Sequence, residues 1–299
     1  DIRRMNTINP KRKIVQLTLA LTLAGVMTSG IVGCGGRTES TTTTSAAIVG
    51  NDSTTATTVT AVTAIATEPT FATFDEEDLS ATWNTSTASL VILAGDSIRF
   101  EGRGATVDGS TLTITSPGTY VISGTLNDGQ IRVESGNADN VRLVLNGADI
   151  SCSTSAPIYV LNADKTIITL AERTENRVTD DTSGRPEDAG SDDPNAAIFS
   201  RDDLTINGSG SLTVTARYNN GIATKDDLRI AGGSITVDAA NDALKGRDCI
   251  GVRAGTITVD AGGDGLQANN SDDLSKGYVS IEGGVFDITA GSDGIRSKD

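Results

Sequence analysis

The chain has 299 residues, no histidine, 3% aromatic residues and a formal net charge of −15. The missing histidine excludes catalytic triads with an imidazole base and zinc sites with imidazole ligands. The acidic balance argues against a nucleic-acid partner, because proteins that bind nucleic acid neutralise phosphates with Lys and Arg.

The N-terminal residues 1–33 have the pattern of a bacterial lipoprotein signal peptide. A basic group, Lys11 to Lys13, precedes an apolar run from Ile14 to Thr28, which is too short to span a membrane and has the length of a secretory signal. The run ends in IVGC, which resembles the lipobox, the motif whose cysteine, here Cys34, is diacylated. The alternative is an ordinary signal peptide that contains a cysteine. We expect an extracellular protein held at the bacterial membrane by its lipid anchor only.

Three further regions follow in chain order. Residues 34–70 are rich in Ser and Thr and predict a flexible linker without a core. Residues 71–299 carry short apolar alternations separated by Gly-containing turns, which predict strands. The alternation breaks between Glu172 and Pro194, where we expect a long polar loop, either functional or merely solvated. The sequence stops inside a repeat, so we expect the C-terminal coils to be missing.

Residues 195–299 repeat one phrase, with equivalent apolar residues spaced 24, 22, 22 and 29 residues apart. Each copy holds three short alternations rich in Ile, Val, Thr and Leu. A fixed short period of strand-like segments predicts an all-β fold, a parallel β-helix with about 22–29 residues per coil. Two apolar columns should then be continuous inside the coil: Ile198, Ile222, Leu244, Leu266 and Ile295, and Leu204, Leu228, Ile250 and Val279.

Acidic residues recur at equivalent positions of these copies and should also stack. Carboxylates one coil apart repel each other, and a hard divalent cation would offset that repulsion with the ligand type it prefers. The sequence therefore predicts a Ca²⁺ site. The alternative is that Asp favours these turns and points into water. The candidate ligands are Asp202, Asp203, Asp226, Asp227, Asp248, Asp242 and Asp264.

Two of the three cysteines lie in the predicted β-helix. Cys152 and Cys249 should be about four coils apart, roughly 19 Å along the axis. A disulfide needs Cα atoms within about 7 Å. We expect two buried free thiols.

Several long phrases carry a resemblance to a known family: GTYVISGTLNDGQIRV, VRLVLNGADI, IITLAERTENRVTD and DDPNAAIFSRDDLTINGSGSLTV. They resemble a bacterial family of extracellular carbohydrate-binding domains, over about Ser89 to Asp299. The resemblance implies a right-handed parallel β-helix similar to that of pectate lyases, with bound calcium. It also implies a plant cell-wall polysaccharide as partner, either polygalacturonate or cellulose.

One pectate lyase family places its catalytic calcium on stacked Asp residues, and the pairs Asp202/Asp203 and Asp226/Asp227 are similar to that arrangement. The resemblance implies that an unprotonated Lys or Arg would remove the C5 proton of a uronic acid. A lysine base needs a lowered pKa, which surrounding carboxylates oppose. Catalysis is therefore the weaker interpretation. The cationic candidates are Lys225, Lys245 and Arg247.

Three functions remain open. The first is a non-catalytic module that binds an acidic polysaccharide with Ca²⁺. The second is a polysaccharide lyase that uses the same Asp–Ca²⁺ site, and the third is a surface adhesin or stalk that calcium only rigidifies. Cellulose binders usually stack sugars on exposed aromatic side chains, but Trp83 precedes the repeats and no aromatic column exists within them. The sequence favours an acidic sugar.

Overall fold

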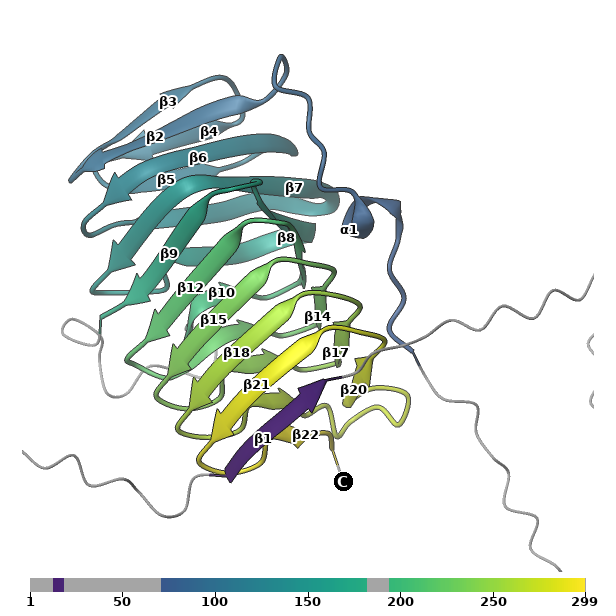
Figure 1. Ribbon diagram of the computed structural model, residues 1–299. Coiled ribbons are helices and arrows are strands. Elements are labelled where there is room, and N and C mark those ends of the chain that lie inside the picture. Colours follow the sequence, from purple (N-terminus) through teal and green to yellow (C-terminus); the bar gives the residue numbers. More distant parts are fainter. Residues whose placement is uncertain (1–12, 19–70, 182–193, 299) are drawn as a thin grey trace, which may run out of the picture. The chain divides into compact units, whose positions relative to one another are not determined.

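The chain folds into a parallel β-solenoid, in which each coil lies on the coil before it (Figure 1). The computed structural model describes residues 13–18, 71–181 and 194–298. The predicted linker, Cys34 and most of the predicted signal peptide lie outside these residues and stay predictions. The all-β fold expected from the repeats is confirmed.

Each regular coil contributes three strands, and equivalent strands of successive coils pair in parallel to form three faces. The first face contains β10 (Ala196–Ser200), β13 (Asn220–Thr224), β16 (Leu244–Gly246), β19 (Leu266–Ala268) and β22 (Ile295–Arg296). The second face contains β11 (Asp203–Gly208), β14 (Asp227–Ile230), β17 (Cys249–Val252) and β20 (Tyr278–Ile281). The third face contains β12 (Ser211–Ala216), β15 (Ser234–Ala239), β18 (Thr256–Ala261) and β21 (Val285–Ala290).

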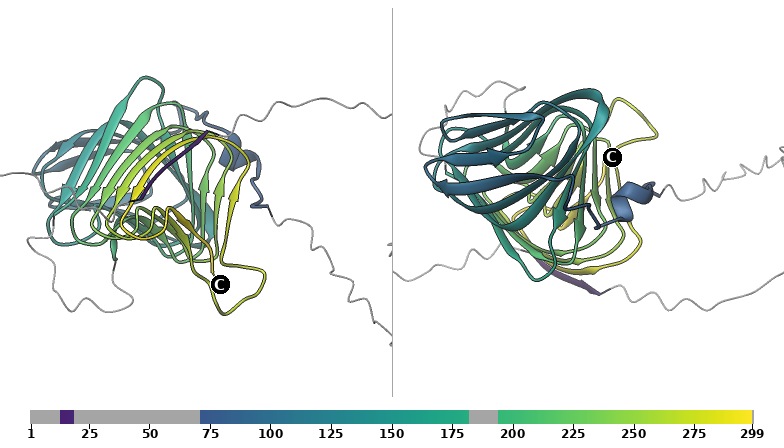
Figure 2. Two further views of the ribbon diagram at one scale, coloured as in Figure 1. Left: turned by 60° about the horizontal axis from the view of Figure 1, so that its bottom comes forward. Right: turned by 90° about the horizontal axis from the view of Figure 1, so that it is seen from above.

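The pairing register confirms both predicted apolar columns. On the first face each residue of the column pairs with its equivalent one coil away, from Ile198 with Ile222 to Leu266 with Ile295. On the second face the column runs from Leu204 to Val279 in the same way. Except at the last coil, these side chains are buried or packed against the core. The view from above in Figure 2 looks along the stacked coils that enclose them.

Alternation within each strand decides which side chains reach this interior. In β15, Ile235 and Val237 are 1% exposed, while Thr236 between them faces solvent. Branched side chains suit this position because they fit a pleated surface, and burying each one contributes about 1.5–3 kcal/mol.

The first part of the domain differs from the regular coils because two antiparallel hairpins open it. Strands β2 and β3 pair antiparallel across Gly95 and Asp96, where the Ala94 amide donates to the Ser97 carbonyl at 2.9 Å. Strands β4 and β5 pair antiparallel across Gly109 and Ser110. A two-residue loop reverses the chain at once, so the following strand runs antiparallel. Parallel stacking begins where β6 pairs with β2. The strands of this part are β2 (Ser89–Gly95), β3 (Ile98–Glu101), β4 (Ala105–Asp108), β5 (Thr111–Ile114), β6 (Gly118–Leu126), β7 (Gln130–Cys152), β8 (Ile158–Leu170) and β9 (Glu175–Asp180).

Strand β9 lies inside the stretch where we expected a polar loop, so the expected start of that loop at Glu172 is wrong. The strand pairs in parallel with β7 and β12. Its inward positions include a polar residue, Asn176, which is 1% exposed and accepts hydrogen bonds from the amides of Gly147 and Ala148. A satisfied buried amide can occupy a core position, and it conceals the alternation in the sequence. Residues 182–193 lie outside the described part.

A short helix that the sequence did not predict, α1 (Glu76–Leu79), lies outside the coil wall (Figures 1 and 2). Asp75 and Asp78 cap it reciprocally, each side chain accepting the backbone N–H of the other. Asp78 is 1% exposed and accepts hydrogen bonds from Thr205 Oγ1 at 2.6 Å and from Lys165 Nζ at 3.0 Å. These contacts fix the segment before the solenoid against β8 and β11.

The edge of β21 is paired with β1 (Lys13–Thr18), which runs antiparallel along it. Such an edge exposes unpaired backbone groups, and an added strand satisfies them. These residues belong to the predicted signal peptide, which stays a prediction. Within the described residues, no helix has both the length and the apolar character needed to cross a membrane.

Cys152 and Cys249 are both free and buried, as predicted. Their side chains are 3% and 2% exposed.

The inward and outward positions should differ sharply in their tolerance of charge. Leu228→Asp places a carboxylate between Leu204 and Ile250, where the native side chain is fully buried. We expect a loss of at least about 2–5 kcal/mol, the range for truncating a buried leucine. Thr236→Lys, on the outward side of β15, should change stability by less than about 0.5 kcal/mol. Urea unfolding of both variants checks the register, and equal destabilisation would contradict it.

Candidate functional site

The turn between the first and second faces places acidic side chains one above another. Asp203 begins β11 and Asp227 begins β14, and the pairing of Leu204 with Leu228 sets these two strands in register. Asp226 lies in the turn just before β14, where its amide donates to Thr224 Oγ1 at 2.7 Å. Stacking therefore brings carboxylates of two coils together without any special loop.

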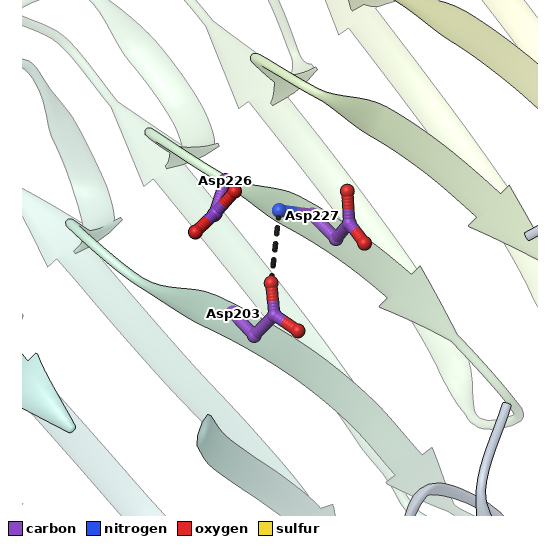
Figure 3. Close-up of side chains that lie close together, drawn as sticks. All are labelled: Asp203, Asp226 and Asp227. Carbon is purple, nitrogen blue, oxygen red and sulfur yellow. Dashed lines mark hydrogen bonds between the residues drawn. The ribbon is translucent and has the colours of Figure 1, made fainter. Parts of the chain in front are cut away.

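Three of the predicted ligands meet in what we call the acidic cluster, Asp203, Asp226 and Asp227 (Figure 3). Each offers one carboxylate oxygen, and these oxygens all lie within 4.8 Å of one another. Asp203 Oδ1 also accepts the backbone N–H of Asp227 at 3.2 Å. The three side chains are partly exposed, so the cluster is open to solvent ions.

An arginine that sequence reasoning missed balances part of this charge. Arg229 donates from Nη1 to Asp203 Oδ2 and from Nη2 to Asp227 Oδ2, both at 2.6 Å, and its side chain is 9% exposed. Its Nε donates to the carbonyl of Thr73 at 2.8 Å. The alternation of β14 contained the signal, because Leu228 points inward and its neighbours Asp227 and Arg229 must share the outer side.

Asp226 has no such arginine and holds its proton tightly. Burial, a hydrogen bond with Asp248 and the negative charges around it raise the pKa of Asp226 to about 7. Burial also raises the pKa of Asp227, although the positive charge of Arg229 opposes the shift. At neutral pH the acidic cluster is therefore a place where added positive charge is favourable.

Two other predicted ligands, Asp202 and Asp248, have partners of their own. Asp202 Oδ2 accepts the amide of Ala163 at 2.9 Å, and burial raises the pKa of Asp202. Asp248 accepts hydrogen bonds from Asn270 and Lys276. Burial alone would raise the pKa of Asp248, but hydrogen bonds from Asp226, Lys276 and Asn270 lower it. Neither carboxylate is among the three that converge, although Asp248 contacts the acidic cluster through its hydrogen bond with Asp226.

The remaining predicted ligands, Asp242 and Asp264, lie in a different column, between the third and first faces. Asp242 Oδ1 accepts the amide of Asp264 at 2.9 Å, and Asp264 Oδ1 accepts that of Asp293 at 2.9 Å. Asn220 Oδ1 begins this ladder by accepting the amide of Asp242 at 3.2 Å. The structure uses these side chains to join successive turns and does not bring them to the acidic cluster.

A groove of about 290 Å³ lies on the first face, and none of the three residues of the acidic cluster lines it. Lys245 pairs there with Asp242 at 2.9 Å, and Arg247 pairs with Asp272 at 2.7 Å. Lys225 and Arg247 directly precede Asp226 and Asp248 in the chain, so the groove and the acidic column share the same turns. The groove is lined by Asn195, Phe199, Lys225, Lys245, Arg247 and Asp272, among others.

The chemistry of the acidic cluster fits a hard divalent cation. Carboxylate oxygens are the ligands that Ca²⁺ prefers, and three of them converge from two coils. Burial, the hydrogen bond with Asp248 and then the charges of neighbouring carboxylates raise the pKa of Asp226. A bound cation would supply positive charge and displace the proton of Asp226.

Comparison with known proteins places this geometry in a family. A family model for carbohydrate-binding domain-containing proteins matches residues 108–299. The chain belongs to this family. The matched part of this carbohydrate-binding domain includes the acidic cluster, the groove and all three faces of the solenoid. The family resemblance predicted from the sequence is therefore confirmed.

Two individual proteins are similar to this carbohydrate-binding domain. One, a carbohydrate-binding domain-containing protein of Acetivibrio thermocellus, is 49% identical over 136 residues, which cover 46% of this chain and 48% of that protein. The match thus spans about half the length of that curated relative. The other is a solved structure of a polysaccharide lyase-like protein from C. thermocellum, a gadolinium derivative. It shares 38% identity and a TM-score of 0.66, covering 70% of this chain and 94% of that chain.

The pKa of Asp226 predicts an inverted pH dependence of stability in the metal-free protein. The folded state keeps this proton up to about pH 7, whereas an unfolded Asp loses it near 3.8. Between these values folding takes up a proton, so this carboxyl lowers stability as pH rises. In EDTA, Asp226→Asn should therefore gain melting temperature over the parent as pH rises from 5 to 8. Asp238→Asn, an exposed carboxylate on β15, controls for the lost charge, and a pH-independent difference for Asp226→Asn would contradict the prediction.

Proposed function

We propose that this carbohydrate-binding domain binds an acidic cell-wall polysaccharide such as polygalacturonate, using Ca²⁺ held by the acidic cluster. The observation that carries the proposal is the juxtaposition of converging carboxylates with a cation-lined groove on the same turns. Ca²⁺ at Asp203, Asp226 and Asp227 would neutralise the cluster. Because Ca²⁺ takes six to eight oxygen ligands, three carboxylates leave coordination positions for a sugar carboxylate.

The groove favours an acidic sugar over a neutral one. It is lined by Lys225, Lys245 and Arg247, which can donate to carboxylates. Its aromatic residue, Phe199, is 1% exposed and offers no stacking surface. The chain as a whole is strongly acidic, so an acidic polymer would be repelled unless local cations, including bound metal, bridge the two.

The contacts of the groove support binding without catalysis. A lyase of the related type needs an unprotonated Lys or Arg as general base. Lys245 and Arg247 instead donate to Asp242 and Asp272, and Arg229 is committed to two members of the acidic cluster. Lyase activity is therefore the second candidate, kept open by the polysaccharide lyase-like protein that shares the fold.

Removal of calcium should weaken the fold and the binding together. At Ca²⁺ about 100-fold above its dissociation constant, the ion contributes about 2.7 kcal/mol. EDTA should then lower the melting temperature by about 5–10 °C and abolish retention on polygalacturonate. Mg²⁺, which prefers a smaller octahedral shell, should restore neither well.

Two double variants test whether the acidic cluster is the calcium site that polymer binding depends on. Asp226→Asn with Asp227→Asn should reproduce the chelated state in the presence of Ca²⁺. Asp238→Asn with Asp260→Asn removes two stacked carboxylates from the third face and should leave binding unchanged. The proposal is overturned if the first double variant keeps its calcium response and still binds the polymer as the parent does.

The same incubation separates the three functions. Retention on polygalacturonate without product supports a binding module. Growth of ultraviolet absorbance from a 4,5-unsaturated uronide would indicate a lyase. Retention on neither polygalacturonate nor a neutral glucan, with calcium still raising the melting temperature, would indicate a calcium-stabilised adhesin or stalk.

We also propose that the protein is anchored outside the cell by a lipid on Cys34. The support is the lipobox-like IVGC after a basic and then apolar run. Cys34→Ala should release the protein from membranes or block removal of the signal peptide. Membrane fractionation with electrophoretic mobility checks this, and unchanged association and mobility would show that the anchor is elsewhere.

A further inference from the structure

A second hollow, separate from the acidic cluster, contains the chain's single tryptophan. It is about 390 Å³ in volume and is lined by Ala81, Thr82, Trp83, Thr85, Leu170, Glu172 and Ser209. The segment between α1 and β2 crosses there over the ends of β8 and β11. Asp203 begins β11 and Ser209 follows its last residue, so the two sites lie roughly 20 Å apart at opposite ends of this strand.

The hollow has the composition of a sugar-binding surface. Trp83 is partly exposed, and its indole offers a flat apolar face. Leu170 lies beneath the hollow and is 1% exposed, so Trp83 is the main apolar surface there. The side chains of Thr82, Thr85, Glu172 and Ser209 supply hydroxyl and carboxylate groups around it. A pyranose ring presents the complementary pattern, with an apolar face of C–H groups and hydroxyls around its edge.

The segment that carries Trp83 is held in place before any ligand arrives. Asn207 Nδ2 donates to the carbonyls of Asp78 and Ser80, at 2.9 and 3.1 Å, and Arg142 Nη1 donates to the same Ser80 carbonyl at 2.9 Å. Asn84 then closes a local turn by accepting the amide of Ser86 at 3.0 Å. A backbone fixed in this way loses little conformational entropy when a ligand binds to it.

The hollow and the groove differ in the charge of the residues that line them. No Lys or Arg lines it among the described residues, and its one ionisable lining group is the carboxylate of Glu172. That carboxylate pairs with Arg173 at 2.9 Å. Arg173 has a φ of 62°, the one positive φ recorded for a non-glycine residue in the described ranges. Such a conformation costs about 1–3 kcal/mol and often marks a functional turn. Because Arg173 balances the charge of Glu172, the hollow offers a uronate no unpaired cation, whereas a neutral sugar would still meet a hydrogen-bond acceptor.

We propose that this hollow is a second carbohydrate subsite, in which one neutral pyranose ring stacks on Trp83 and hydrogen-bonds to Glu172 and the neighbouring hydroxyls. The site needs no metal. Trp83 and the other lining residues of 81–85 precede the part of the chain that the family model matches, whereas Leu170, Glu172 and Ser209 lie within it. Together with the groove, this subsite would let one domain hold two chemically different polysaccharides.

Because the chain has one tryptophan, its fluorescence reports on this site alone. The full chain in EDTA is titrated with neutral hexasaccharides, cellohexaose and xylohexaose, and separately with trigalacturonate. We expect at least one neutral oligosaccharide to shift the emission of Trp83 and protect it from acrylamide, and trigalacturonate to do neither. The response should persist in Asp226→Asn with Asp227→Asn. Unchanged emission with both neutral oligosaccharides up to about 10 mM would overturn the proposal.

Variants then test Trp83 without relying on fluorescence. By calorimetry, Trp83→Ala should weaken binding of the neutral hexasaccharide at least about tenfold, and Trp83→Phe should restore part of it. Binding of polygalacturonate with Ca²⁺ should stay unchanged in both. Leu274→Ala, at a side chain that is 94% exposed, is the matched control for loss of surface apolar area. An unaltered affinity for the neutral sugar in Trp83→Ala would overturn the subsite while leaving the calcium-dependent function untouched.

Discussion

In-register parallel stacking is the constraint on which this molecule depends. Each residue lies about 4.8 Å from its equivalent in the next coil, so residues of the same type lie next to one another. For Ile and Leu this gives continuous buried columns. For Asp it brings negative charges together, and three kinds of contact offset the repulsion. Arg229 lies between Asp203 and Asp227, and Asp226 holds a proton. Asp242 and Asp264 accept backbone amides.

The segment before the solenoid matters more than its short helix suggests. Its Asp78 carboxylate accepts hydrogen bonds from Lys165 and Thr205. Its Thr73 carbonyl accepts one from Arg229 Nε. The arginine that balances the acidic cluster is thus oriented partly by a residue some 150 positions earlier. The same segment carries Trp83, so one outer strap supports both candidate sites, at opposite ends of the second face.

The repeat made most of the fold predictable. Equivalent spacing was enough to align both apolar columns, since a period fixes which residues lie side by side. The two hairpins were harder to predict, although the two-residue loops at Gly95–Asp96 and Gly109–Ser110 carried a signal. Strand β9 was not predicted, because the buried Asn176 interrupts its apolar pattern. The side chain of Asn176 instead accepts hydrogen bonds from two backbone amides.

The candidate site could be predicted only as columns of residue types. Asp226 follows the aligned Ile222 by four residues and Asp242 precedes the aligned Leu244 by two, so spacing assigns them to different columns. It does not say that Asp226 faces carboxylates while Asp242 accepts the backbone amide of the next coil. That difference depends on where a turn aims its side chain, which spacing does not encode. The partners of Asp248 differ in this respect. Asn270 holds the equivalent position one coil on, so the repeat places it beside Asp248, whereas Lys276 comes from extra residues present in one copy only.

Those extra residues show how such a protein can change over time. The coil from Leu266 to Ile295 is longer than its neighbours, yet Leu266 still pairs with Ile295 and Val259 with Ile288. The added length leaves the stack as a loop, and each doubling of a loop costs only about 0.6 kcal/mol. An insertion within a strand would instead turn every following side chain to the wrong side. Insertions are therefore tolerated in the turns between strands but not within the strands. New functional residues should arise in these turns, while the number of residues in each strand stays constant.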